Sequence, residues 1–221
     1  MLRLLLIRHG ETDWNASGRY QGQMDIPLNE AGVEQARILG RRLRNEPSGP
    51  IEPVRPPGSI NALYASDLAR AWQTAQTVGE ACGLAPQPEP RLRELSFGEW
   101  QGLTYQEIGE RDPEALVAWN RDRVNCRPPG GESLGAMAAR VRALLDDVRR
   151  DYRDGTVVLV SHGGTIRIIL CVLLGHPLAD YWQFAVDNTA IAEIEVHTLG
   201  PVVVRWNDAH HLRQLHRQDV F

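Results

Sequence analysis

Two histidine–glycine pairs lie at points where a buried strand is expected to end. Residues 4–10 read LLLIRHG, and residues 157–164 read VVLVSHGG. Nearly continuous apolar runs of this length are typical of strands that are buried on both faces of a parallel sheet. Because ligands bind beyond the carboxyl ends of such strands, His9 and His162 could face each other across one site.

The residue types at these two points favour phosphoryl chemistry. A neutral imidazole has an unperturbed pKa of about 6.5, so it can attack phosphorus at neutral pH without a separate base. Arg8 adds a planar guanidinium, which can bind two phosphate oxygens at once. A helix predicted directly after His162 would add free N–H groups and the positive end of a helix dipole, and both favour an anion.

A structural role and a metal site are weaker interpretations of these histidines. A single histidine at a strand end is more often a hydrogen-bonded structural residue, so the prediction depends on both histidines together with Arg8. A metal ion would need further ligands, and no Asp or Glu stands at metal-ligand spacing near either histidine. We therefore expect neither a metal ion nor a cofactor.

The composition excludes other classes of protein. Arginine supplies all 24 basic residues counted apart from histidine, and the chain has no lysine, which excludes lysine Schiff-base chemistry and the lysine-dependent P-loop. The net charge of −4 argues against a nucleic-acid partner, which would normally meet a basic face. The 43% of hydrophobic residues is ordinary for a soluble globular protein.

Cysteine usage and the length of the apolar runs bear on location. The three cysteines, Cys82, Cys126 and Cys171, are far apart and form neither a disulfide framework nor a metal-type spacing. This pattern is typical of a reducing compartment. The apolar runs at residues 4–7 and 168–174 are too short for a signal-peptide core or a membrane span. We expect a cytoplasmic protein that has no membrane partner.

Strand and helix signals alternate along the chain. The expected strands cover residues 2–7, 60–65, 156–160, 190–196 and 202–206. The expected helices begin at the N-caps Asn29, Ser66 and Ser133 and at Thr165, with short helices at 105–111 and 113–121. The alternation predicts a three-layer α/β/α sandwich with a mainly parallel sheet. We expect a single domain over residues 1–221, with the proline-rich residues 46–59 as a surface excursion.

Five motifs, in this order along the chain, carry a resemblance to a known family. They are LIRHGET at 6–12, SDLARA at 66–71, LRELSFGEWQG at 92–102, PGGES at 129–133 and SHGG at 161–164. Together they closely resemble the histidine phosphatase superfamily, whose fold is that of phosphoglycerate mutase. The triplet Arg-His-Gly alone would be a weak match, but five motifs in the expected strand and helix context are specific.

The resemblance assigns roles to the candidate residues. It implies that His9 is the nucleophile that becomes a phosphohistidine, and that Arg8, Arg70 and His162 hold the phosphoryl group. It implies that Glu94 is the general acid that protonates the leaving oxygen and then activates water. Arg91 and Arg93 flank this acid, and the sequence does not say whether they point toward it.

The resemblance also implies contacts with the substrate. Asn15, Gln21 and Gly22 match positions that contact the phosphoryl group or the rest of the substrate. Gly163 follows His162, and a glycine there would let the backbone approach a ligand closely, as would Gly10 after His9. The implied partner is a small-molecule phosphomonoester.

The superfamily includes both phosphatases and mutases. Mutases of this group resemble ERHYG after the acid, where residues 94–98 of this chain read ELSFG, and they carry a longer middle insertion that excludes water. The shorter segment here is similar to the broad-specificity and α-ribazole phosphatases, and it favours hydrolysis by a phosphomonoesterase of the histidine acid phosphatase type. The alternatives are a cofactor-dependent phosphoglycerate mutase and a non-catalytic phosphate-binding or scaffold module. The presence of all five core residues disfavours the latter.

Several features stay open at this point. The natural substrate depends on a variable segment at about 95–132, where Tyr105 and Trp119 could shape the leaving-group pocket or pack in the core. His210, His211 and His216 form a small cluster without a cysteine or carboxylate frame, and we interpret it as a tail or dimer-contact feature. The family includes monomers, dimers and tetramers, so a homodimer is one of the expected states.

Overall fold

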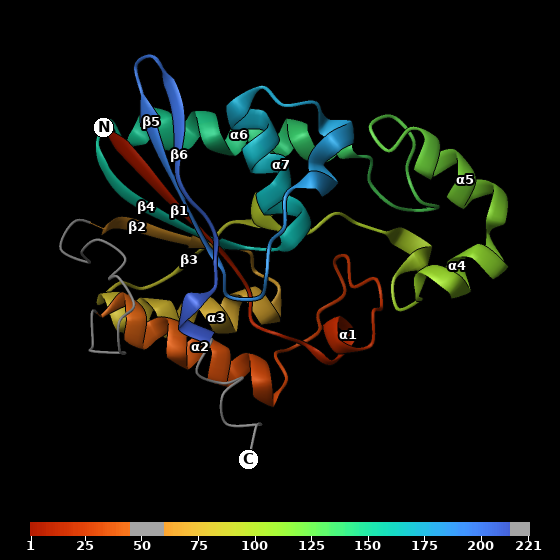
Figure 1. The fold of residues 1–221 in the computed structure, drawn as a ribbon, viewed down its shortest axis with the longest axis horizontal. Coiled ribbons are helices and arrows are strands. Elements are labelled where there is room, and N and C mark those ends of the chain that lie inside the picture. The colour runs from red at the N-terminus through yellow and green to blue at the C-terminus, as the bar shows by residue number, and fades with distance from the viewer. Residues whose placement is uncertain (45–59, 213–221) are drawn as a thin grey trace.

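A mainly parallel sheet forms the centre of the computed structural model, which describes residues 1–44 and 60–212 (Figure 1). The strand order within these residues is β3-β2-β4-β1-β5-β6. The bounds are β1 Leu2–Arg8, β2 Ile60–Ala65, β3 Gln87–Pro88, β4 Gly155–Ser161, β5 Ile191–His197 and β6 Gly200–Asp208. The predicted excursion at 46–59 and His216 lie outside the described residues.

The pairing of β1 with β4 brings the two histidine motifs together. These strands are parallel and in register, with Ile7 opposite Val160 and Arg8 opposite Ser161. His9 and His162 therefore follow neighbouring strands at the same edge of the sheet. Strands β5 and β6 are antiparallel and extend the sheet on the other side of β1, so the prediction of a mainly parallel sheet is confirmed.

Helices cover both faces of the sheet (Figure 1). Helices α2 and α3 lie on one face and α6 and α7 on the other, which confirms the three layers. Along β1, Leu4 and Leu6 pack with the α6 and α7 side, while Leu5 and Ile7 pack with α2 and α3, because successive side chains of a strand point to opposite faces. The helix bounds are α1 Asp13–Ala16, α2 Glu30–Leu43, α3 Ala69–Cys82, α4 Tyr105–Arg111, α5 Pro113–Arg121, α6 Leu134–Asp151 and α7 Gly163–Leu174, with 3₁₀ turns η2 Pro90–Leu92, η3 Gly98–Trp100 and η4 Leu178–Gln183.

The predicted helix starts are correct at two N-caps and wrong at two other places. Asn29 and Ser133 cap α2 and α6 through their side chains, as expected. Ser66 does not cap α3, whose N-cap is Leu68, because the Ser66 hydroxyl lies 2.8 Å from the ring of His162. Helix α7 follows His162 directly, as expected, but it begins at Gly163 and not at Thr165, since His162 itself occupies the N-cap position.

The variable segment forms α4 and α5, which project beside the sheet (Figure 1). Trp119 of α5 is buried and packs edge-to-face against Trp100 at 5.8 Å and Phe97 at 6.0 Å between ring centroids. Because its ring is buried among these aromatic side chains, Trp119 packs in the core and does not shape the leaving-group pocket. Tyr105 is 53% exposed. No helix among the described residues has the length and apolar character needed to cross a membrane.

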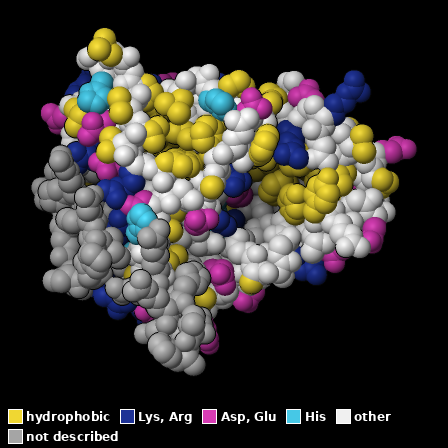
Figure 2. Space-filling model, in the orientation of Figure 1, with side chains coloured by type: hydrophobic (Ala, Val, Ile, Leu, Met, Phe, Trp, Pro, Cys, Tyr) yellow, Lys and Arg dark blue, Asp and Glu magenta, His cyan; other side chains and the backbone are white. Residues whose placement is uncertain are grey.

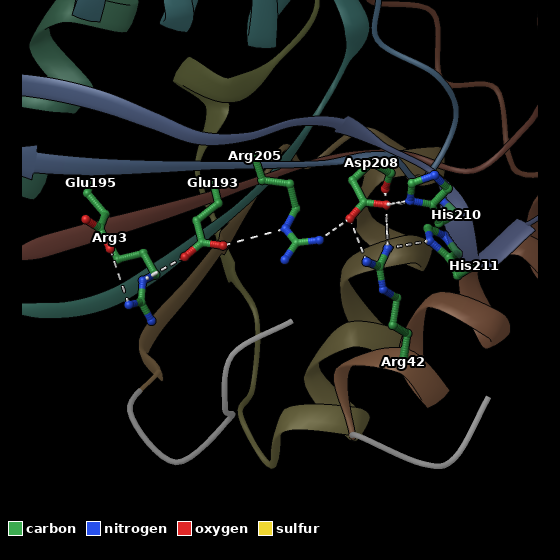
Figure 3. Close-up of polar contacts among 8 residues, drawn as sticks. All are labelled: Arg3, Arg42, Glu193, Glu195, Arg205, Asp208, His210 and His211. Carbon is green, nitrogen blue, oxygen red and sulfur yellow. Dashed lines mark hydrogen bonds and ion pairs between the residues drawn. The ribbon is translucent and has the colours of Figure 1, made fainter. Parts of the chain in front are cut away.

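A network of charged residues links β1, β5, β6 and α2 (Figure 3). Arg3 contacts Glu193 at 3.0 Å, and Arg205 lies between Glu193 and Asp208. Arg42 of α2 is buried and forms a bidentate pair with Asp208, with distances of 3.0 and 2.6 Å. This pair joins the last turn of α2 to the end of β6 across 166 residues of sequence.

His211 belongs to this network, so its interpretation as a tail or dimer-contact residue is wrong. Its ring is buried, accepts a hydrogen bond from Arg42 at Nδ1 and lies 3.0 Å from the Thr189 hydroxyl at Nε2. Since Arg42 can only donate, Nδ1 carries no proton and the ring is neutral. Burial, reinforced by the charge of Arg42, lowers the pKa of His211 to about 4.

This shift predicts a pH dependence of stability. Because the folded protein holds His211 below its unfolded pKa of about 6.5, acid stabilises the unfolded chain as pH falls from 6.5 toward 4. Between pH 7 and 4.5, we expect His211 to account for about 2 kcal/mol of the lost free energy of unfolding. The measurement is urea unfolding of wild type and of His211→Asn, whose side chain does not titrate, at pH 7 and at pH 4.5. The contribution is the difference between the free energies of unfolding that the two proteins lose over this range. The same pH dependence in both proteins would contradict it.

Candidate active site

A cavity of about 290 Å³ lies at the carboxyl ends of β1 and β4. Eight of the nine predicted site residues line it, and the ninth, His162, lies fully buried beside His9. The eight are Arg8, His9, Asn15, Gln21, Gly22, Arg70, Glu94 and Gly163. Phe97, from the segment on which the substrate was expected to depend, also lines the cavity. The lining is completed by residues to which the sequence analysis assigned no place in the site: Gly18, Arg19, Tyr20, Gly164 and Arg167.

His9 is held as a neutral imidazole with one nitrogen free. Its Nδ1 lies 2.6 Å from the carbonyl oxygen of Gly10. A carbonyl can only accept, so Nδ1 carries the proton and Nε2 keeps its lone pair. Burial lowers the pKa of His9 well below 6.5, and the charges of Arg70 and Arg8 lower it further.

His162 lies directly against the nucleophile. The two ring centroids are 5.1 Å apart, and Nε2 of His162 is 2.8 Å from the Ser66 hydroxyl. Burial, followed by the charge of Arg70, lowers the pKa of His162 well below 6.5. Its Nδ1 is buried and has no hydrogen-bond partner among the described residues.

Arg8 and Arg70 are held by backbone carbonyls and not by carboxylates. Arg8 donates to the carbonyl of Val186 at 2.6 Å. Arg70 donates to the carbonyls of Gly22 at 2.7 Å and Met24 at 2.8 Å. Burial lowers the pKa of Arg8, and it lowers that of Arg70 to about 10, so Arg70 stays protonated at neutral pH. In the described chain no carboxylate lies within ion-pair distance of either arginine, and their charge remains available to an anion.

Glu94 lies at the amino-terminal end of α7. Its Oε1 accepts from the backbone N–H of Leu95 and its Oε2 from that of Gly164, both at 2.9 Å. Arg140 and Gln23 donate to the carbonyl of Glu94 at 3.2 and 3.1 Å, which fixes the backbone under the carboxylate.

The two arginines that flank Glu94 in the sequence point away from it. Arg91 pairs with Glu89 and Asp147, each at 2.7 Å. Arg93 pairs with Asp67, its Nε donating at 2.7 Å. The sequence left open whether Arg91 and Arg93 point toward Glu94. Both pair with other carboxylates, so neither forms an ion pair with the acid.

The glycines of the site have different neighbours from those expected. A Cβ on Gly10 would lie 2.5 Å from the carbonyl oxygen of Gly32, so this glycine lets the chain after β1 pack closely against α2. A Cβ on Gly163 would meet Arg8 at 3.5 Å, an ordinary contact. At Gly164 a Cβ would lie 2.3 Å from Oε1 of Glu94, so a side chain there would displace the carboxylate.

Of the predicted substrate contacts, one has a polar atom without a protein partner, and two make hydrogen bonds within the protein. Gln21 lies in the cavity wall with its buried Oε1 unpaired among the described residues. Gly22, at φ +51, supplies the carbonyl that holds Arg70. The Oδ1 of Asn15 caps its own helix α1 by accepting from the backbone N–H of Thr12 at 3.2 Å, while Asn15 also lines the cavity.

A segment before β5 holds the backbone of the nucleophile from behind. Asn188 donates to the carbonyl of His9 at 3.0 Å, and the N–H of Thr189 donates to that of Arg8 at 3.1 Å. Thr189 adopts φ +55, a conformation that costs free energy for a β-branched residue. Its hydroxyl bonds to His211, so the network of Figure 3 extends to the nucleophile.

Comparison with known proteins gives one family over most of the chain. The family model described as histidine phosphatase superfamily (branch 1) matches residues 4–209. Phosphoserine phosphatase 1 of Hydrogenobacter thermophilus is 34% identical over 216 residues, which cover 98% of this chain and 97% of the relative. A protein of Yersinia pestis named probable phosphoglycerate mutase GpmB is 36% identical over 199 residues, covering 88% and 85%.

Solved structures give the same result. The mycobacterial glucosyl-3-phosphoglycerate phosphatase has a TM-score of 0.79 at 35% identity, covering 93% of this chain and 98% of the other. The α-ribazole phosphatase from Shigella flexneri has a TM-score of 0.81 at 29% identity, covering 94% and 96%. These likenesses confirm the predicted fold and the resemblance on which the candidate roles were based.

The contact of Gly164 with Glu94 generates a prediction. In Gly164→Ala, the new methyl group displaces the carboxylate, and we expect kcat/KM for p-nitrophenyl phosphate to fall about 100-fold because the acid is mispositioned. The control is Gly109→Ala in α4, whose Cβ would meet only Leu116 at 3.6 Å. An unchanged rate in the folded Gly164→Ala protein would contradict the placement of the acid.

Proposed function

The chain belongs to the histidine phosphatase superfamily, and on that premise we propose that it hydrolyses small phosphomonoesters through a phosphohistidine on His9. One observation carries the proposal: a neutral imidazole with a free Nε2 shares the cavity with the half-buried Arg8 and the buried Arg70, and no carboxylate of the described chain lies within ion-pair distance of either arginine. This combines a nucleophile with fixed positive charge for the phosphoryl oxygens.

The first step transfers the phosphoryl group to the protein. Nε2 of His9 attacks phosphorus, the P–N bond forms, and the bond from phosphorus to the ester oxygen breaks. Protonated Glu94 gives its proton to the leaving oxygen, which departs as an alcohol. Arg8, Arg70 and the positive end of α7 stabilise the charge on the equatorial oxygens, and Nδ1 of His162 is free to donate to one of them.

The second step returns the protein to its starting state. Glu94, now a carboxylate, takes a proton from a water molecule as the water oxygen attacks phosphorus. The P–N bond breaks, inorganic phosphate leaves, and His9 is again a neutral imidazole. Because these arginines and the helix end supply the positive charge, we propose a reaction of the histidine acid phosphatase type that needs no metal ion.

Hydrolysis is favoured over mutase activity by the lining of the cavity. Of the variable segment 95–132, Phe97 is the one residue that lines it, while α4 and α5 pack to the side (Figure 1). A segment that does not close over the site leaves the phosphohistidine accessible to water. The similarity to a probable phosphoglycerate mutase keeps the mutase as the second candidate.

The small cavity and the surface bear on partners. A volume of about 290 Å³ suits a small metabolite ester as the substrate.

Strand β6 lies at the edge of the sheet order, and apolar side chains are exposed on the face that Figure 2 shows. Val202 and Val204 of β6 are half exposed. An apolar edge strand supports the proposal of a homodimer. We propose that the enzyme acts in the cytoplasm and binds no nucleic acid.

A ³¹P NMR time course tests the proposed function. Wild type incubated with 3-phosphoglycerate, a trace of 2,3-bisphosphoglycerate and several sugar and nucleoside phosphates should accumulate inorganic phosphate. His9→Ala should lose at least about 10³-fold in rate, since no phosphohistidine can form. His197→Ala, at an exposed histidine of β5, serves as the matched control. A 2-phosphoglycerate signal without free phosphate would show a mutase instead.

The role of Glu94 has its own test. In Glu94→Gln, alkyl phosphates should lose at least about 100-fold in kcat, because their leaving oxygen needs a proton. p-Nitrophenyl phosphate needs none, so it should still phosphorylate His9 and give a stoichiometric burst of p-nitrophenolate before slow turnover. Equal losses for both kinds of ester, with no burst, would contradict the assignment.

A further inference from the structure

One cation in the cavity wall has no part in the reaction just described. Arg167 lines the cavity together with Arg8, Arg19 and Arg70. Arg8 and Arg70 flank the nucleophile, and Arg19 is neutralised by Glu107 at 2.9 Å. Arg167 therefore requires a separate explanation.

Arg167 is held in place while its charge stays unpaired. Its Nε donates to the carbonyl of Phe184 at 2.7 Å, which fixes the plane of the guanidinium. Over residues 1–44 and 60–212, no hydrogen bond is made by its two terminal nitrogens and no carboxylate lies within ion-pair distance. Its charge also contributes to lowering the pKa of Arg8, so the two cations are close enough to repel each other. A partly buried cation that repels its neighbour suits an anionic ligand.

The position of Arg167 separates it from the phosphoryl site. It follows Gly163 by four residues on α7, so both lie on the same face of the helix, one turn or about 5.4 Å apart. A phosphomonoester carries roughly two negative charges, which Arg8, Arg70 and the helix end already balance. A substrate group that meets Arg167 would therefore lie a few bonds beyond the ester oxygen.

The free atoms of Arg167 match a carboxylate. Two terminal nitrogens in one plane bind the two oxygens of a carboxylate side by side. One guanidinium balances the single charge of a carboxylate, whereas a second phosphoryl group would bring about two charges. The unpaired Oε1 of Gln21 in the same cavity adds an acceptor for a hydroxyl or ammonium group on the substrate.

We infer that Arg167 forms a carboxylate subsite, and that the preferred substrates are small phosphomonoesters with a carboxylate a few bonds from the ester oxygen. This inference rests on the proposed phosphatase function and adds the class of substrate to it. Arg167 determines specificity and takes no part in the chemical steps on His9.

Matched pairs of esters test the inference. 3-Phosphoglycerate and glycerol 3-phosphate differ by a carboxylate in place of a CH₂OH group, and O-phosphoserine and O-phosphoethanolamine differ by the presence of the carboxylate. Wild type should prefer the carboxylate ester of each pair by at least about tenfold in kcat/KM. In Arg167→Gln, kcat/KM for the two carboxylate esters should fall until the preference is lost. For glycerol 3-phosphate and O-phosphoethanolamine, kcat/KM should change by less than about twofold.

Two further variants separate charge from fold. Arg167→Lys keeps the charge but not the planar fork, so it should recover part of the preference. Arg121→Gln, at an exposed position of α5, removes a distant positive charge and should behave as wild type.

The outcomes distinguish this inference from the function on which it rests. Phosphate release without a preference in wild type, or an equal loss for both members of a pair in Arg167→Gln, overturns the carboxylate subsite and leaves the phosphatase intact. No His9-dependent release from any of the four esters or from p-nitrophenyl phosphate overturns both.

Discussion

The burial of positive charge without an acidic partner is the constraint on which the rest of the site depends. Arg8 and Arg70 are held by the carbonyls of Val186, Gly22 and Met24, so their orientation is fixed while their charge is not cancelled. Such an arrangement costs folding free energy, and it persists only where surrounding packing enforces it. Here the register of β1 with β4 and the layers of helices on both faces provide that packing.

The same charge that suits a phosphoryl group keeps the nucleophile reactive. Burial together with Arg70 and Arg8 lowers the pKa of His9, so the ring is neutral at the pH where a phosphomonoester is a dianion. The Gly10 carbonyl then selects the tautomer with a free Nε2. Glu94 is kept in the same cavity by two backbone N–H groups and by the absence of a side chain at Gly164, which allows the acid to approach the start of α7.

Regions far from the cavity contribute by fixing the backbone. The pair formed by Arg42 and Asp208 positions His211, which bonds to Thr189, and Thr189 in turn holds the carbonyl of Arg8 (Figure 3). The antiparallel strands β5 and β6 therefore do more than widen the sheet, because they carry the segment that lies behind the nucleophile. The strained backbone of Thr189 is consistent with a position that this packing imposes.

The sequence by itself determined the elements and the two ends of strands where the chemistry lies. Apolar runs, caps at Asn29 and Ser133 and turn residues are local signals. The five motifs contain Arg8, His9, Arg70 and Glu94, which line one cavity, and His162, which lies buried beside His9. Only the tertiary structure decided that Ser66 bonds to His162, that Gly10 packs on Gly32, that His211 is buried, and that Arg167 lines the cavity. The physical reason is the distance along the sequence over which each kind of interaction acts. Backbone preference and periodicity act over a few residues, whereas these contacts join segments that only the packing of the whole sheet brings together.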